Sequence, residues 1–211
     1  MGAIASFFSE GGFWMYPIAL MSVIAVAIVI ERLIQLLSLN INGAAFMAQI
    51  QKLVMADNID RAIKICNSSP KAALPKVIKS GLTRANKGEI EIQNAVEEAT
   101  LEIVPSIQKR TNGLQAVANL ATLLGLLGTV IGLIQAFAAV ANAAPDQKAT
   151  MLTNSIAIAM NTTAFGLMVA IPTMGIHAML AAFTKKIIDD IDQYSVKLEN
   201  LLISRGKRAQ G

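Results

Sequence analysis

Charge is nearly absent from residues 111–184, where Asp146 and Lys148, in one short break, are the only charged side chains. The uncharged runs on either side, 111–145 and 149–184, are 35 and 36 residues long. A helix of that length, rising about 1.5 Å per residue, exceeds the roughly 30 Å hydrocarbon core of a bilayer. Both runs therefore predict membrane-spanning helices. Neither run contains an Asp or Glu, so neither helix can supply a carboxylate within the membrane.

Cysteine and histidine are also scarce, because Cys66 and His177 are the only residues of their types. An internal disulfide is excluded, and a single His cannot hold a metal ion alone. The sequence has no CxxC, HExxH, Walker or GxGxxG motif and no nucleophile–base set. We predict neither an enzyme nor a cofactor or metal site. Cys66 is expected to be a small buried residue on a helix, and His177 to make a polar contact near the end of a span.

A third apolar run covers residues 13–30 and begins with Trp14 and Tyr16, aromatic residues favoured at a membrane interface. It ends at Glu31-Arg32. No Lys or Arg precedes the run, so the basic segment of a signal peptide is missing. We therefore expect a retained transmembrane helix.

The basic residues are distributed unevenly along the chain. Of 18 Lys and Arg residues, residues 1–12 hold none, 142–150 hold one, 31–112 hold eleven and 185–211 hold six. The positive-inside rule then places the N-terminus outside and the C-terminus inside. The net charge of +4 comes without a cluster of basic and aromatic residues, so no nucleic-acid partner is predicted.

These features predict an all-α membrane protein with three transmembrane helices, a helical cytoplasmic domain and a long third helix that extends into the cytoplasm. The lipid bilayer is then one of its partners. The predicted segments are a periplasmic or interfacial N-terminus (1–12), transmembrane helices (13–37, 111–141 and 151–184), a helical cytoplasmic domain (38–110), a periplasmic loop (142–150) and a cytoplasmic helical extension with a basic tail (185–211).

Short helices are expected inside the cytoplasmic domain. One covers about 43–56, and Asn58 caps the next, which runs through Cys66. Ser69-Pro70 is expected to start a third helix. Gly88 precedes a fourth, which continues into the second span with a bend at Pro105.

After residue 184 apolar side chains recur at three- and four-residue steps, which predicts a helical stripe. The stripe packs either on its own chain or on a second copy. From residue 204 onward we expect a disordered basic tail. The stripe residues are Ile187, Ile188, Ile191, Tyr194, Leu198, Leu201 and Leu202.

Small and hydroxylated residues line the second and third spans at helical spacing. One interpretation is tight helix packing, because small residues let backbones approach closely. The other is a hydrophilic lining that faces a charged partner helix. The residues expected at helix or partner contacts are Gly125, Gly128, Gly132, Gly166, Ala170 and Pro172.

Two segments resemble the paired motifs of the ExbB/TolQ/MotA ion-channel family. Residues 124–132, LGLLGTVIG, are similar to LGLLGTVxG, and residues 156–172, IAIAMNTTAFGLMVAIP, are similar to IAEALxATAxGLxxAIP. Glu31-Arg32-Leu33 after the first span also matches. The resemblance implies a TolQ/ExbB-like subunit of the bacterial inner membrane that forms a homo-pentamer around a dimer of a single-span ExbD/TolR/MotB-like partner. The partner's membrane Asp would take the ion, and Thr129 and Thr163 would line its pathway.

The chain departs from the family pattern at two places. Ile158 stands where ExbB and TolQ have a Glu, and Asn161 and Thr162 precede Thr163 where those relatives have apolar residues. Tandem threonines resemble the sodium-driven flagellar stators, so Thr162, Thr163 and Asn161 are candidate sodium contacts. Thr162 is then expected on the ion pathway together with Thr129 and Thr163. The transported ion is therefore H+ or Na+.

The sequence allows two functions for the protein and two roles for the charged residues Glu31 and Arg32. The resemblance favours a channel-forming motor subunit, and the alternative is a non-conducting membrane scaffold. Glu31 and Arg32 mark the membrane boundary, where they either reach towards the aqueous interface or bind a neighbouring subunit.

Overall fold

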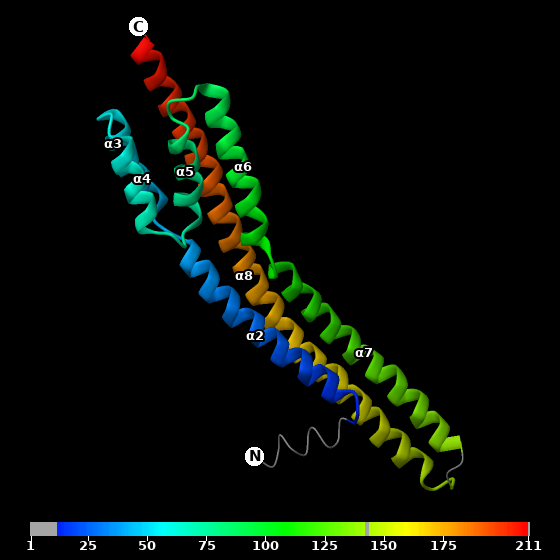
Figure 1. The fold of residues 1–211 in the computed structure, drawn as a ribbon. Helices are drawn as coiled ribbons and strands as arrows, with labels where there is room; N and C mark the ends of the chain where they lie inside the picture. Colours follow the sequence, from blue (N-terminus) through cyan, green and yellow to red (C-terminus); the bar gives the residue numbers. More distant parts are fainter. Residues whose placement is uncertain (1–11, 142–143, 211) are drawn as a thin grey trace. The chain divides into compact units, whose positions relative to one another are not determined.

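The computed structural model describes residues 12–141 and 144–210, and these residues form helices joined by short turns, with no strand among them. The predicted N-terminal segment 1–12 lies almost entirely outside the described residues, as do positions 142 and 143 of the predicted loop. The helices are α2 (Met15–Leu39), α3 (Gly43–Met55), α4 (Ile59–Ser68), α5 (Ala73–Thr83), α6 (Glu89–Gln108), α7 (Thr111–Ala141) and α8 (Lys148–Gln210) (Figure 1).

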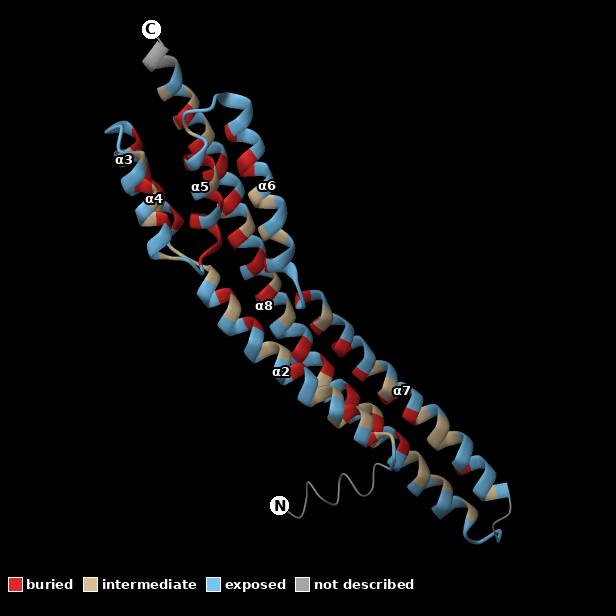
Figure 2. Cartoon of the chain, viewed as in Figure 1, coloured by how far each residue is buried: buried red, intermediate tan, exposed pale blue. Residues whose placement is uncertain are grey.

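Three helical stretches are long and apolar enough to cross a membrane: Met15–Met55, Glu89–Ala141 and Lys148–Gly206. Only 17%, 17% and 22% of their most apolar 18-residue windows are buried within the chain. Residues coloured as exposed accordingly run along much of α2 and α7 (Figure 2). Such surface requires lipid or other protein around it.

The chain forms two compact units. Unit 1 consists of Met1–Glu31 and Arg110–Met179, and unit 2 of Arg32–Lys109 and Leu180–Gly211. Unit 1 therefore contains most of α2, all of α7 and the first half of α8. Unit 2 contains the end of α2, all of α3 to α6 and the rest of α8.

The helices of unit 2 begin where the sequence has suitable caps. Asn42 caps α3 by accepting a hydrogen bond from the Ala45 N–H at 3.2 Å. Gly88 precedes α6 with φ +102°, a conformation that disfavours residues with a Cβ, and Glu89 and Glu91 occupy the first turn. Asn58 does precede α4, but its side chain makes no capping hydrogen bond.

Three details differ from the prediction. Ser69 is the C-cap of α4, and α5 begins only at Ala73, because the Ala72 N–H closes a turn on the Ser69 carbonyl.

Helix α6 does not continue into α7. It ends at Gln108, and Arg110 has φ +64°, which breaks the helix; Pro105 lies within α6. Helix α8 runs to Gln210, so the backbone from residue 204 is helical.

The apolar stripe of α8 is the core of unit 2. Ile191 and Leu198 are fully buried, and Ile187 and Leu202 nearly so. Two side chains of the stripe pack closely on glycines of other helices. A Cβ on Gly43 would lie 2.5 Å from the Tyr194 ring, and a Cβ on Gly81 would lie 2.8 Å from Leu198 Cδ2. The stripe therefore packs on its own chain.

Candidate functional site

Helices α7 and α8 of unit 1 touch backbone to backbone at Gly125 and Gly166. A Cβ on Gly166 would lie 2.8 Å from the Ala121 carbonyl oxygen and 3.0 Å from Gly125 Cα. A Cβ on Gly125 would lie 3.2 Å from Gly166 Cα. Neither position has room for a side chain. This close approach brings the groups on the neighbouring turns of both helices within hydrogen-bonding distance.

Thr129 and Thr163 lie in this crossing, and their hydroxyl groups are hydrogen-bonded to each other. Both are also within reach of one acceptor, the Gly125 carbonyl, at 3.1 Å from Thr129 Oγ1 and 2.8 Å from Thr163 Oγ1. The pair has two hydroxyl hydrogens, of which one joins the two oxygens and the other goes to the carbonyl. Both side chains are half-buried.

The lone pairs that remain on these two oxygens can accept a hydrogen bond or contact a cation. The site therefore suits a protonated or positively charged group better than an anion. Two threonines 34 positions apart in the sequence form this polar contact inside otherwise apolar helices.

Thr162 lies on a different face of α8 from Thr163. It is only 2% exposed, and its Oγ1 lies 3.4 Å from the Ile158 carbonyl of the same helix. Its methyl group fills the space beside Gly128, where a Cβ would lie 2.5 Å from Thr162 Cγ2. Asn161 is half-buried on the preceding position. The hydroxyl groups of Thr162 and Thr163 thus have separate surroundings.

The remaining small residues of the two stripes occupy different environments. A Cβ on Gly132 would lie 2.9 Å from Ala159 Cβ. Ala170 is buried, whereas Pro172, inside α8, is exposed. Three of the four glycines of these stripes, Gly125, Gly128 and Gly166, surround the threonine pair or its neighbouring turn.

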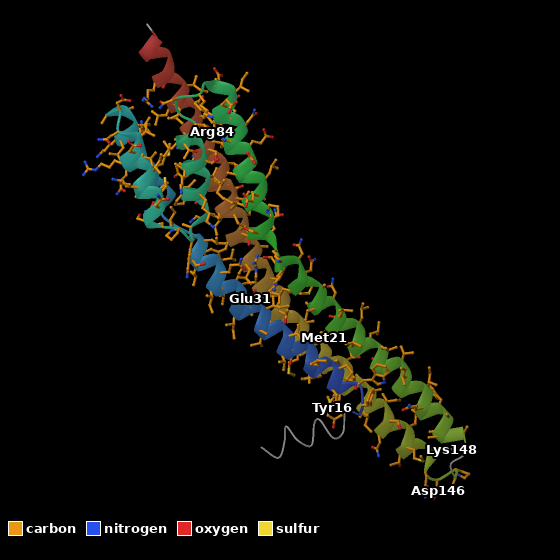
Figure 3. All side chains as sticks on the ribbon, viewed as in Figure 1. Tyr16, Met21, Glu31, Arg84, Asp146 and Lys148 are labelled. Atoms are coloured by element: carbon orange, nitrogen blue, oxygen red, sulfur yellow. The ribbon has the colours of Figure 1, made fainter. Side chains whose placement is uncertain are left out.

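Glu31 and Arg32 bind within their own chain. In unit 1 the Arg110 guanidinium donates to the Glu31 carboxylate, and this hydrogen bond raises the pKa of Arg110 above its ordinary value (Figure 3 labels Glu31). In unit 2 Arg32 is fully buried, donating to the Ile107 carbonyl and, at 2.6 Å, to Gln35 Oε1.

The sequence did not identify Gln35, Ile107 or Arg110 as partners of this pair. The positive φ of Arg110 shows only in the structure, and a backbone carbonyl such as that of Ile107 carries no signal in the sequence.

Titratable side chains are rare around the threonine pair. Within the described residues of α7 and the part of α8 before Lys185, the only charged side chain is Lys148, which lies with Asp146 at the turn between the helices (Figure 3). The described residues also contain no group of three His, Cys, Asp or Glu placed to hold a metal ion.

Comparison with known proteins gives consistent matches. The model of the MotA/TolQ/ExbB proton channel family matches residues 69–193, which include Thr129 and Thr163. The protein named ExbB-like 3 of Synechocystis sp. is 28% identical over 176 residues, 78% of each chain. The ExbB homolog of Methanothermobacter thermautotrophicus is 31% identical over 56% of this chain and 40% of that protein. Biopolymer transport protein exbB1 of Vibrio cholerae is 35% identical over 42% of this chain and 36% of that protein.

Proposed function

We propose that this chain, which belongs to the MotA/TolQ/ExbB proton channel family, is the channel-forming subunit of an ion-driven motor in the bacterial inner membrane. Its partner would be a single-span ExbD/TolR-like protein whose membrane Asp binds the ion. Ion flow would then do mechanical work on a periplasmic partner or the outer membrane. The names of relatives in Synechocystis sp. and Vibrio cholerae support biopolymer transport as the process.

The hydrogen-bonded pair Thr129–Thr163 is the observation that carries this proposal. The pair offers oxygen lone pairs in an otherwise apolar stretch, which favours the protonated or ion-loaded form of a passing carboxyl group. A neutralised Asp, protonated or ion-loaded, is held at this polar contact, and it can slide along the apolar faces of the helices to the same contact of the next subunit. The membrane potential supplies about 2.3 kcal/mol per elementary charge per 100 mV.

The third span of this chain contains no acidic residue, which fits a mechanism in which the partner supplies the carboxylate. Ile158 occupies the position at which ExbB and TolQ relatives have a Glu. A carboxylate in hydrocarbon is costly unless it is paired, so an acid on the partner that moves along the helices needs polar groups at intervals on its path. This chain would provide these polar groups, and its partner would provide the charged side chain.

The proton is the first candidate for the transported ion and sodium the second. Thr163 supplies a proton route together with Thr129. A sodium site would add Thr162 and Asn161, whose neutral oxygens suit a dehydrated cation. The Thr162 side chain is almost fully buried against Gly128, so a change of its volume alters packing as well as chemistry.

Replacement of the threonine pair tests the proposal. Thr163→Val and Thr129→Val keep the shape and delete the hydroxyl group, and each should lower ion-driven output by about twofold to tenfold, because a lost hydrogen bond costs about 0.5–1.5 kcal/mol. Assembly, measured by size-exclusion chromatography, should persist. The matched controls are Thr122→Val and Thr173→Val, whose hydroxyl groups bond only to their own helices at Ala118 and Val169.

Unchanged output in both variants would instead support a non-conducting scaffold. The backbone contact between Gly125 and Gly166 is the observation that favours this second candidate, because close helix packing serves assembly without any ion flux.

The ion itself is tested with Thr162→Val, which keeps the methyl group that packs on Gly128 and removes the hydroxyl group. If sodium is transported, this variant should need a higher sodium concentration for half-maximal output. If protons are transported, output should persist in sodium-free buffer at constant membrane potential and change little in the variant. Thr162→Ser, which keeps the hydroxyl group, is the matched control for packing.

A further inference from the structure

Unit 2 contains a polar pocket of about 440 Å³ that the proposed ion pathway does not use. It lies where the segment between α2 and α3 meets the extension of α8. Part of its wall is formed by the side chain of Tyr194, which packs on Gly43. The groups able to bind a ligand are Asn40, Asn42, Lys186 and Asp190.

The pocket offers one positive and one negative charge. Lys186 and Asp190 are four residues apart on α8, so their Cβ atoms lie about 5–6 Å from each other on one face. Neither forms an ion pair with another residue in the part of the chain that the structure describes. One face of the Tyr194 ring is occupied by Lys197, whose Nζ lies 5.0 Å from the ring centroid. Asp190 is the one acidic side chain that lines the pocket, so it is the group best suited to receive a ligand cation.

The two asparagines complement Lys186. The Asn42 side-chain oxygen already accepts the Ala45 N–H at the start of α3, which leaves its amide nitrogen as a donor. Asn40 brings a second amide. Together with the ammonium group of Lys186, these donors suit the oxygens of a phosphate.

The pocket lies where two apolar helices end. Asn40 directly follows α2, and Lys186 follows the uncharged run of α8 that ends at residue 184. One turn towards the apolar side of each helix stands an exposed large apolar residue, Leu37 at 69% and Phe183 at 48% exposed. A ligand with a polar head in the pocket and apolar chains on these side chains fits this arrangement.

We propose that this pocket binds the head group of a phospholipid that carries a primary ammonium, such as phosphatidylethanolamine. The phosphate binds Lys186 and the amides of Asn40 and Asn42, and the ammonium donates hydrogen bonds to Asp190. A phosphocholine head group fits less well because its quaternary ammonium has no N–H to donate. A phosphoglycerol head group has no cation for Asp190.

Lipid binding to the purified full-length protein in detergent tests the proposal. Native mass spectrometry would compare phosphatidylethanolamine, phosphatidylcholine and phosphatidylglycerol with identical acyl chains. The wild-type protein should prefer phosphatidylethanolamine, and Lys186→Ala should weaken its binding about tenfold, the usual effect of losing one charged hydrogen bond. Asp190→Asn should remove the preference over phosphatidylglycerol.

Neighbouring residues provide matched controls. Lys185→Ala and Asp189→Asn remove the same charges from the adjacent positions of α8, which do not line the pocket, and should leave the lipid preference unchanged. Far-UV circular dichroism would verify that all four variants are folded.

Three results would overturn the proposal. The first is equal binding of the three lipids. The second is an equal loss in Lys185→Ala and Lys186→Ala, which would mean a general attraction to surface charge. The third is displacement of the lipid by millimolar inorganic phosphate or free phosphoethanolamine, which would assign the pocket to a soluble ligand. The measurement uses no partner protein or ion gradient, so its outcome is independent of the motor function.

Discussion

At the scale of single residues, two glycines determine how closely α7 and α8 approach. The atoms that a Cβ on Gly166 would meet, the Ala121 carbonyl oxygen and Gly125 Cα, belong to the backbone. A backbone cannot move aside as a flexible side chain can. Added volume at this position must therefore push the helices apart, and with them the hydroxyl groups of Thr129 and Thr163.

We expect Gly166→Ala to destabilise the protein by about 1–3 kcal/mol, the usual cost of overpacking a close contact. The variant should also lose ion-driven output, because separation of the helices breaks the threonine pair. Thermal unfolding in detergent gives the first quantity. Gly175→Ala on the same helix is the matched control, since a Cβ there meets nothing within 4 Å. Equal stability of the two variants would contradict the close contact.

Cys66 is a buried thiol, and burial raises its pKa from 9.0 to about 11, although the charge of Lys79 acts in the opposite direction. We expect iodoacetamide at pH 8 to react with the native protein about 100-fold more slowly than with the denatured chain, because each unit of pKa lowers the thiolate fraction about tenfold. Mass spectrometry of the alkylated chain measures the difference. Equal rates would place the thiol in solvent.

The same shift makes stability depend on pH in the alkaline range. The folded protein holds the Cys66 proton more tightly than the unfolded chain does. The contribution of the thiol is therefore intact below about pH 9 and is lost as the pH rises towards 11. Cys66→Ala should lose less stability over this interval than the wild type.

At the scale of helices, α6 and α8 place two acidic side chains close together. Burial, and secondly the charge of Glu97, raises the pKa of Glu199 above its ordinary value of 4.5. A raised pKa means that the folded state favours the protonated form. Stability from this group is thus present below about pH 4.5 and is lost as the pH rises through the folded pKa.

We expect Glu199→Gln to raise the unfolding temperature at pH 7 and to have little effect near pH 4, where the wild-type carboxyl group is also neutral. Circular dichroism melts at both pH values measure this. Glu98→Gln, at an exposed position of α6, removes an equal charge and should change neither melt. A lower unfolding temperature for Glu199→Gln at pH 7 would show that this carboxylate is stabilised by a favourable contact.

At the scale of the whole molecule, the predicted orientation in the membrane rests on the distribution of Lys and Arg. Cysteines introduced in a Cys66→Ala background test it, because Ala144 and Ser68 are both exposed positions. Ala144→Cys should react with an impermeant thiol reagent applied to the periplasmic side, and Ser68→Cys should not. The reverse pattern would overturn the predicted orientation.

The exposed apolar surface also predicts an assembly. With at most 22% of each apolar window buried, the exposed apolar side chains of the spans need lipid or other protein around them, and the family resemblance implies further copies of this chain. We expect a pentamer in mild detergent by native mass spectrometry. A persistent monomer at working concentrations would contradict the expected oligomer.

Local features of the sequence predicted most helices of this chain. Uncharged apolar runs predict three spans. The helices predicted at about 43–56 and after Gly88 correspond to α3 and α6, because a cap acts on the next few residues only. The start of α5 and the break before α7 were not predictable in this way. They depend on a turn closed at Ser69 and on the left-handed conformation of Arg110.

The contacts between helices were decided by the tertiary structure alone. The motif selected Thr129 and Thr163, but their shared acceptor at Gly125 and the burial of Thr162 against Gly128 depend on how α7 crosses α8. Arg32 likewise binds a carbonyl 75 positions away. Composition and periodicity describe which face of a helix is apolar or small. The partner of that face is determined by packing between segments distant in sequence, which no local pattern encodes.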